Sequence, residues 1–384
     1  MKATETTITG EINATTNDVI SLFKKVTVIP GLSSNENQVA DFIKNQLQHL
    51  DLHITEDDAG KLTGGNCGNL IVAPYHIDTT QPVTAFVAHM DTARDSSVTK
   101  IVHKNGRITS DGNSQLGADN RAGVALLLWY LQNIACSEVK ANIICIFTVG
   151  EEKGMLGAKQ LELSKWNVQH ACVFDSSLDP GSFISNCAGM VLFESRFIGK
   201  AAHSAVSNGN GINAISMAAI AISSINKHPI PDEMSANIGM ISGGEATNIV
   251  APSCTIQGEV RGFDNQAIQD YLNKLEASCL KAADTTGGKC EWSTQTDFSS
   301  YTISEKLPFR KYIETAIQRI GLKPVGVKYT GGSDANTINE KGIPAINLGI
   351  GAKNPHADDE YIMEADFKKM EALIQELHHT NNSI

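Results

Sequence analysis

The stretch "ADNRAGVALLLWYLQNIACSEVKANIICIFTVGEE", residues 118–152, joins a mostly apolar helix to an apolar strand. We expect the helix over 118–134, and the strand "ANIICIFTV" to end before Gly150. A strand that is apolar throughout is typical of a sheet buried on both faces. Glu151 and Glu152 follow directly. They either open a helix, where the positive end of the helix dipole suits acidic residues, or they coordinate or activate a ligand.

The segments on either side of this stretch continue the alternation of strand and helix. Strands are expected at "LHITED", "NLIVAPY" and "VTAFVAHM" before it and at "HACVFDSS" after it, and residues 16–50 are predicted to form two helices separated by "VIPGLSSNENQ". Ser33 or Ser34 is available as the N-cap of the second helix. Alternating strands and helices predict an α/β fold, with a mixed, mostly parallel sheet covered by helices.

The pattern changes after residue 186. Strands and helices then follow the order βαββαβ, a ferredoxin-like arrangement that can form a compact domain by itself. We expect a main domain of residues 1–186 and 298–384, with an inserted domain of residues 187–297. The apolar helix at 212–225 suits packing against its own sheet better than it suits a dimer face.

Composition narrows the class of protein. The 384 residues carry a formal net charge of −11, which argues against a nucleic-acid surface or an anionic membrane as partner. No apolar run has the length of about 18 residues that a membrane span needs. The first residues lack the apolar core of a signal peptide, so we expect none. Eight cysteines without a CxxC pair indicate reduced thiols and a cytoplasmic protein.

Acidic residues and histidines gather at the predicted strand ends. Each has an ordinary interpretation by itself, as a satisfied histidine, a helix cap, a first-turn acid or an Asx-turn. So many acidic and imidazole groups at the ends of core strands are unusual. In open α/β sheets, ligands bind at the carboxyl ends of the strands. The imidazole and carboxylate groups suit Zn²⁺, Co²⁺ or Mn²⁺. The residues are His89, Asp91, Asp119, Glu151, Glu152, Asp175 and His356.

Several motifs carry a resemblance to a known family. "HMD", "GADNRAG", "GEE", "FDSS", "GKAAHSA" and "NPHADDE" occur in the order found in the M20 metallopeptidases, and "GGSDANTINEKGIPAINLGIG" follows the peptidase T-like branch. The resemblance extends from about residue 16 to 378. It implies a zinc-peptidase-like catalytic domain, an inserted lid or dimerisation domain, and two divalent metal ions, with zinc expected and cobalt or manganese as alternatives.

The same resemblance implies a division of the metal ligands. His89 and Asp175 would bind one ion, Glu152 and His356 the other, and Asp119 would bridge the two. Two positions depart from the family's usual pattern. Asn120 replaces an acid, and "FDSS" replaces a "DG" dipeptide.

Further roles are implied around this ligand set. Asp91 would fix the ring of His89, Glu151 would act as the general base, and His203 would support the oxyanion. Substrate binding is implied for Arg261, whose fork suits a carboxylate, and for three other positions. These are Asn248, Gly332 and Ser333, with Gly331 in the same loop.

The expected function is therefore a two-metal hydrolase that cleaves peptide bonds of short peptides, an aminopeptidase acting on tripeptides or similar substrates. An amidohydrolase of N-acyl amino acids on the same scaffold is the alternative. A non-catalytic binding protein would lack the base or a ligand, and a phosphoesterase would need more cationic residues near the site. The expected partners are a short peptide or small amide and a second copy of the chain through the lid, without nucleic acid or membrane.

Overall fold

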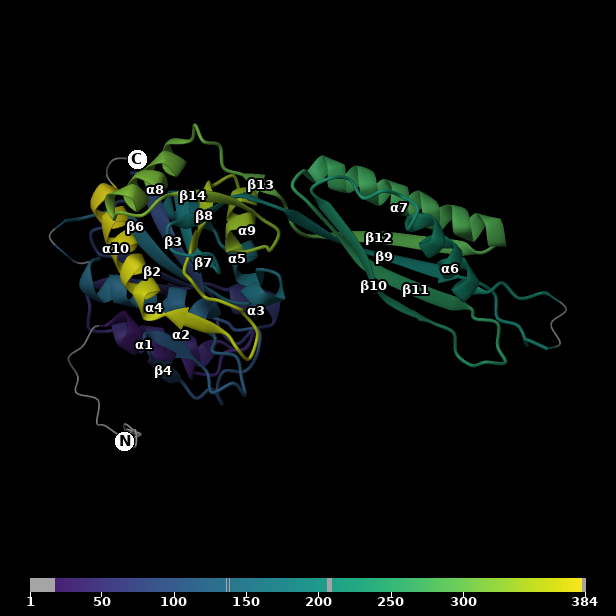
Figure 1. Cartoon of the computed structure of the whole chain (residues 1–384), viewed down its shortest axis with the longest axis horizontal. Helices are drawn as coiled ribbons and strands as arrows, with labels where there is room; N and C mark the ends of the chain where they lie inside the picture. Colours follow the sequence, from purple (N-terminus) through teal and green to yellow (C-terminus); the bar gives the residue numbers. More distant parts are fainter. Residues whose placement is uncertain (1–17, 136, 138, 206–208, 382–384) are drawn as a thin grey trace.

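The computed structural model describes residues 18–135, 137, 139–205 and 209–381. A larger α/β body holds both ends of the described chain, and a second sheet with two helices projects from it (Figure 1). The α/β class, with an inserted βαββαβ unit, confirms the predicted fold class.

The large sheet contains nine strands in the order β1-β2-β6-β3-β7-β15-β8-β13, with β14 paired to β8. Its central strands β6, β3, β7 and β15 run parallel, and antiparallel pairs lie toward both edges. The strands are β1 (Leu52–Glu56), β2 (Leu70–Pro74), β3 (Val83–His89), β6 (Ile143–Thr148), β7 (Val168–Ser176), β8 (Ser182–Cys187), β13 (Tyr301–Thr302), β14 (Val325–Tyr329) and β15 (Ala345–Gly349).

Helices cover both faces of this sheet. Its central strands are therefore buried along most of their length. On one face Phe86 packs edge-on against Tyr130 of α4, and on the other Thr148 hydrogen-bonds to Asp334 of α9. The first layer contains α1 (Val19–Thr27), α2 (Asn37–Leu47), α4 (Ala118–Asn133), α8 (Pro308–Arg319) and α10 (Glu364–Thr380); the second contains α3 (Ala59–Thr63), α5 (Leu156–Gln160) and α9 (Asp334–Glu340).

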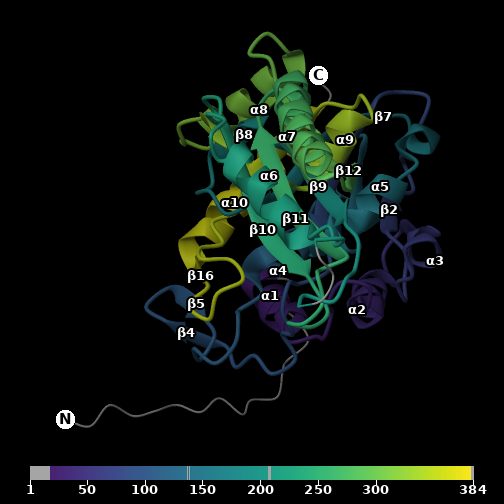
Figure 2. The same ribbon diagram turned by 90° about the vertical axis from the view of Figure 1, so that its right-hand side faces the viewer.

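The projecting unit has its own core, and its strand order β10-β11-β9-β12 is that of a ferredoxin-like sheet. Figures 1 and 2 show α6 and α7 on the same face of this sheet. We call this unit the lid. It consists of β9 (Gly189–Ile198), α6 (Ala214–Ile225), β10 (Met234–Gly243), β11 (Ser253–Gly262), α7 (Asn265–Thr286) and β12 (Lys289–Phe298).

Helix α6 serves two surfaces. Met217, Ala218 and Ala221 are buried against the lid sheet, as expected for this helix. Ile215 and Ile220 are each 43% exposed on its outer side. The same helix therefore also offers apolar side chains to solvent or to a partner.

Some local structure differs from the expectation. A three-stranded sheet of β16 (Tyr361–Met363), β5 (Arg107–Thr109) and β4 (Val102–Lys104) was not predicted. The Glu pair opens a 3-10 turn, η1 (Glu151–Lys153), and a second such turn, η2 (Leu163–Trp166), precedes β7. In the described ranges, no helix is long and apolar enough to cross a membrane.

The N-cap expected for α2 is also different. Glu36 occupies that position and makes no side-chain capping bond. Ser33 instead donates its hydroxyl to Asp91, 2.6 Å away. The serine is therefore used by the polar cluster at the sheet end rather than by the helix.

Candidate metal centre

The predicted ligands come together at the carboxyl ends of the parallel strands. His89 is the last residue of β3, Asp175 lies near the end of β7, and the Glu pair follows β6. His356 lies in the loop between β15 and β16, and Asp119 is in the first turn of α4. The alternation of strands and helices thus brings five separate chain segments to one edge of the sheet.

Asp119 stands between two groups of side chains. Its Oδ1 is 3.1 Å from His89 Nε2, and that nitrogen is also 3.2 Å from Asp175 Oδ1. Its Oδ2 is 3.4 Å from His356 Nε2, which is 2.8 Å from Glu152 Oε1. The two oxygens of one carboxylate therefore belong to two donor groups, the arrangement that a bridging ligand requires.

These separations fit divalent ions. Donors about 2.1 Å from a tetrahedral ion lie about 3.4 Å from one another, close to the distances around Asp119. Each group holds three donor atoms within 4.8 Å of one another. Glu152 Oε1 is buried and has no hydrogen-bond donor in the described part of the chain, since His356 lies near it without hydrogen-bond alignment. A cation would satisfy this oxygen. His89, Glu151 and Glu152 form a third grouping, whose possible donor atoms also lie within 4.8 Å of one another.

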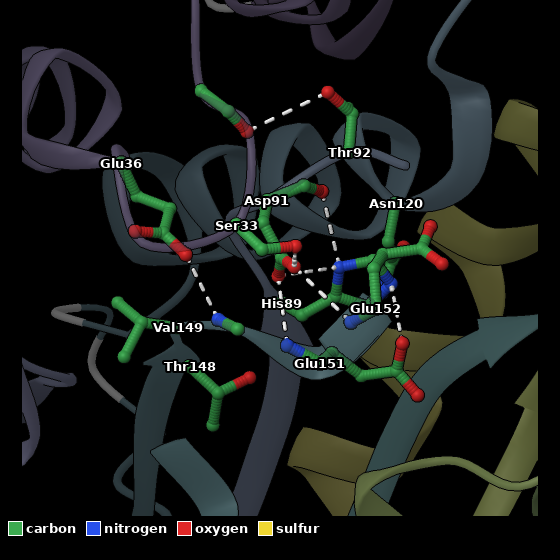
Figure 3. Close-up of polar contacts among 12 residues, drawn as sticks. Ser33, Glu36, His89, Asp91, Thr92, Asn120, Thr148, Val149, Glu151 and Glu152 are labelled. Atoms are coloured by element: carbon green, nitrogen blue, oxygen red, sulfur yellow. Dashed lines mark hydrogen bonds and ion pairs between the residues drawn. The ribbon is translucent and has the colours of Figure 1, made fainter. Parts of the chain in front are cut away.

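Asp91 is fully buried, and Figure 3 shows it between the His89 ring and the backbone of Glu151. Its Oδ1 is 3.2 Å from His89 Nδ1, which leaves Nε2 of that ring directed at Asp119 and Asp175. It also accepts the backbone N–H groups of Glu151 at 3.0 Å and Glu152 at 3.1 Å. One carboxylate thus fixes a ligand ring and the turn that carries the Glu pair.

The electrostatics of the ligand set are those of paired opposite charges. Burial acts to lower the pKa of His89, but the charge of Asp175 and hydrogen bonds to nearby carboxylates hold it well above its usual value. The nearby carboxylates of Asp119 and Glu152 raise the pKa of His356 to about 10. Burial acts to raise the pKa of Asp119, yet the two imidazoles hold it below its usual value. Positive charge at the two imidazoles therefore stabilises this carboxylate.

Glu151 has a different environment from its neighbour. Burial raises its pKa well above the usual value, with Asp175 and Asp334 adding to the effect and His89 opposing it. Its Oε2 lies 4.0 Å from His89 Nε2, beyond the contact distances of the ligand oxygens. A buried carboxyl with a raised pKa takes up a proton more readily than an exposed one, which suits a group that accepts and then releases a proton.

Local backbone features place two of the ligands. The β7–β15 register shifts between Leu348 and Gly349, so that Asp175 is the extra residue of a bulge in β7. Asp119 has non-helical backbone angles within the first turn of α4. Gly123 lets that turn approach β7, because a Cβ there would overlap the carbonyl oxygen of Phe174. The helix start and the bulge therefore meet closely.

Four buried polar residues near the site were not singled out from the sequence. Glu360 accepts the backbone N–H groups of Gly117 at 2.6 Å and Asp119 at 3.0 Å, and so ties the His356 loop to α4. The others are Glu36, Arg121 and Asp334, all fully or almost fully buried. Glu360, Arg121 and Asp334 lie within the family motifs "NPHADDE", "GADNRAG" and "GGSDANTINEKGIPAINLGIG", whereas Glu36 lies in none of the motifs.

His203 does not lie with the ligand cluster within this chain. Strand β9 begins beside the α/β body and spans about 30 Å, and His203 follows its far end, exposed and paired with Ile249. Asn248 lies beside it, where its carbonyl oxygen accepts the N–H of Ser204 at 3.0 Å. These two residues belong to the distal end of the lid.

Arg261 lies at the opposite end of the lid. Its guanidinium donates to both carboxylate oxygens of Glu259, at 3.0 and 3.3 Å, and to the carbonyl oxygen of Thr330 at 3.1 Å. Gly331, Gly332 and Ser333 follow Thr330 and lead into α9. The four predicted substrate-binding residues are thus divided: Asn248 lies at the far end of the lid, whereas Arg261 lies at its near end beside the loop of the α/β body that carries Gly332 and Ser333. Their roles stay predictions.

Known proteins resemble the chain over most of its length. The family profile described as "Peptidase dimerisation domain" matches residues 188–286, and that of "M42 glutamyl aminopeptidase" matches residues 99–180. An uncharacterised Bacillus subtilis protein, YqjE, is 30% identical over 339 residues, which cover 88% of this chain and 91% of YqjE.

Two solved structures share the whole fold. Aminopeptidase PepT from Bacillus cereus is 27% identical with a TM-score of 0.86, and a tripeptidase from Staphylococcus aureus is 28% identical with a TM-score of 0.87. Each superposition covers 95% of this chain and 98% of the other. The similarity includes both the α/β body and the lid.

Proposed function

The chain belongs to the peptidase T branch of the M20 peptidases, and we propose that it is a metal-dependent aminopeptidase that releases the N-terminal residue of tripeptides or similar short peptides. The observation that carries this proposal is the position of Asp119, whose two oxygens face two separate histidine-containing groups. The names of the aligned structures, an aminopeptidase and a tripeptidase, favour peptides over N-acyl amino acids as substrates.

We assign the residues as follows. His89 and Asp175 would hold one ion, Glu152 and His356 would hold the other, and Asp119 would contribute to both donor groups. Two ions bound there would lower the pKa of a water molecule and polarise the scissile carbonyl. The donor set of imidazole and carboxylate suits Zn²⁺, with Co²⁺ or Mn²⁺ as substitutes.

Glu151 moves the proton in this mechanism. Its buried carboxylate takes a proton from the attacking water and delivers it to the leaving amine. Asp91 keeps the Glu151 backbone and the His89 ring in place during both steps. Arg261 would bind the substrate carboxylate after releasing Glu259.

We further propose that the chain works as a homodimer of two-domain subunits, with residues 1–186 and 298–384 catalytic and residues 187–297 forming the lid. His203 lies too far along the lid to reach the ligands of its own chain in this arrangement. A partner's lid would supply it, which agrees with the dimerisation-domain match. We place the enzyme in the cytoplasm, since all seven cysteines in the described ranges are free thiols.

Hydrolysis by the zinc-reconstituted protein tests the function. The panel contains tripeptides, dipeptides, tripeptides with an acetylated N-terminus and N-acetyl amino acids. We expect turnover of free tripeptides and loss of turnover on N-acetylation. Faster hydrolysis of N-acetyl amino acids would favour the amidohydrolase, and no turnover of any amide at full metal loading would refute the enzyme assignment.

A further inference from the structure

Arg121 is a buried cation directly behind the metal centre. Its side chain is 0% exposed, and within the described ranges it is the one Lys or Arg side chain that is buried. Nη2 donates to the carbonyl oxygen of Ile29 at 3.3 Å, whereas Nε and Nη1 have no hydrogen-bond partner among the described residues. A guanidinium stays charged in proteins, so its burial has a cost unless opposite charges lie nearby.

Those opposite charges belong to Glu36 and Asp91. Both carboxylates are 0% exposed, and both act electrostatically on Arg121. Glu36 Oε2 is itself a buried atom without a hydrogen-bond partner in the described part of the chain. The charge of Glu36 therefore acts on Arg121, and each of the two side chains has buried polar atoms without a hydrogen-bond partner among the described residues.

The two carboxylates hold the turn that carries the Glu pair (Figure 3). Glu36 Oε1 accepts the backbone N–H of Gly150 at 2.9 Å, and Asp91 accepts those of Glu151 and Glu152. Three successive backbone N–H groups of one turn thus donate to two buried carboxylates. Without a counter-charge these acids would repel each other and the carboxylates of the site.

We propose that Arg121 is a positioning residue, whose buried guanidinium neutralises Glu36 and Asp91 and so fixes the Gly150–Glu152 turn before any metal binds. The inference rests on the proposed roles of Glu151 and Glu152, but it adds a residue that touches neither substrate nor ligand atoms. Gly31 supports it, because a Cβ at that position would overlap Arg121 Nη2. The loop before α2 is therefore shaped around the guanidinium.

A double-mutant cycle tests the charge pairing. Arg121→Met removes the cation, Glu36→Gln removes one acid while keeping an acceptor for Gly150, and the third variant combines them. We measure the zinc dissociation constant by competition with a chromophoric chelator and the Tm of metal-free protein. Arg121→Met should weaken zinc binding at least tenfold and lower the Tm. Adding Glu36→Gln should recover part of both losses, since it restores the charge balance.

Two further variants separate charge from shape. Arg121→Lys keeps the cation and should bind zinc within threefold of wild type, so it also serves if Arg121→Met gives no folded protein. Arg319→Met removes an arginine that is 57% exposed and paired with Glu376, and it should leave zinc binding unchanged. Because Arg121 touches no substrate, its replacement should lower kcat and leave KM unchanged.

Three results would overturn the inference: additive effects of Arg121→Met and Glu36→Gln, zinc binding by Arg121→Met within twofold of wild type, or a loss in Arg121→Lys as large as in Arg121→Met. Failure of the proposed function has a different signature. A wild-type protein that binds zinc but hydrolyses no peptide would refute the peptidase, while the cycle in zinc affinity and Tm would still decide the role of Arg121.

Discussion

Adjacent acids at the end of β6 have separate surroundings. Glu152 Oε1 lies 2.8 Å from His356 Nε2, while Glu151 Oε2 stays 4.0 Å from His89 Nε2. Their backbone amides both bind Asp91, so the side chains diverge from a common anchor. One carboxylate can therefore act as a ligand while the other remains available to carry a proton.

Exchanging each acid for its amide tests this division. Glu151→Gln should retain both metals and lose about 10²–10⁴-fold in kcat, the usual contribution of a general base. Glu152→Gln should lower the metal content, because an amide is a weaker ligand than a carboxylate. Metal analysis and kcat at saturating tripeptide give the answer. A reversed outcome, with metal lost from Glu151→Gln, would favour the third grouping of His89, Glu151 and Glu152.

At the scale of elements, the approach of α4 to β7 sets the distance between Asp119 and Asp175. Gly123 permits it, because a Cβ there would overlap the Phe174 carbonyl oxygen and the Asn120 side chain. Gly123→Ala should cost about 1–3 kcal/mol of stability through overpacking, and should weaken zinc binding. Thermal unfolding and zinc titration measure both effects. Gly65→Ala, where a Cβ meets only ordinary contacts, is the control. Wild-type zinc affinity in Gly123→Ala would show that α4 can shift without disturbing the ligands.

Helix α10 contributes a pH-sensitive contact to the same layer. His378 Nε2 donates to the carbonyl oxygen of Val139 at 2.8 Å, and Nδ1 of the neutral ring accepts the hydroxyl of Tyr130 at 3.0 Å. Burial lowers the pKa of His378 below its ordinary value of 6.5. Below pH 6.5 the unfolded chain binds more protons at this residue than the folded chain does. The contribution of His378 to stability should therefore be fully present above that pH and decrease as the pH falls.

The Tm of zinc-loaded protein between pH 5.5 and 8 measures this contribution. His378→Gln keeps a donor and an acceptor but cannot take up a proton, so its Tm should depend less on pH than that of wild type. His49→Gln, at an exposed position, should leave the pH dependence of wild type unchanged. Parallel curves for His378→Gln and wild type would assign the acid sensitivity to other groups.

For the whole molecule, the sequence predicts most of the layout because strand and helix periods differ and parallel strand ends converge. Those rules bring His89, Asp119, Glu152, Asp175 and His356 together, although their roles stay predictions. These rules do not predict the small sheet, because a three-residue strand is too short to show an alternation of apolar and polar residues. In addition, β5 pairs with β16, which lies about 250 positions away in the sequence. They also miss Arg121, because a polar residue in the first turn of a helix is ordinary until the fold encloses it.

The position of His203 leads to a prediction about the assembly. If a partner's lid supplies this residue, His203→Ala and Glu151→Gln should each be nearly inactive as homodimers. Mixed after reversible dissociation, they should form heterodimers with one complete site, made of Glu151 from one chain and His203 from the other. Random pairing gives half heterodimers with one working site in two, so about a quarter of wild-type activity should return. Tripeptide hydrolysis before and after mixing measures the recovery. Mixed protein that stays inactive although native mass spectrometry shows heterodimers would mean that His203 acts, if at all, within its own chain, after a large movement of the lid.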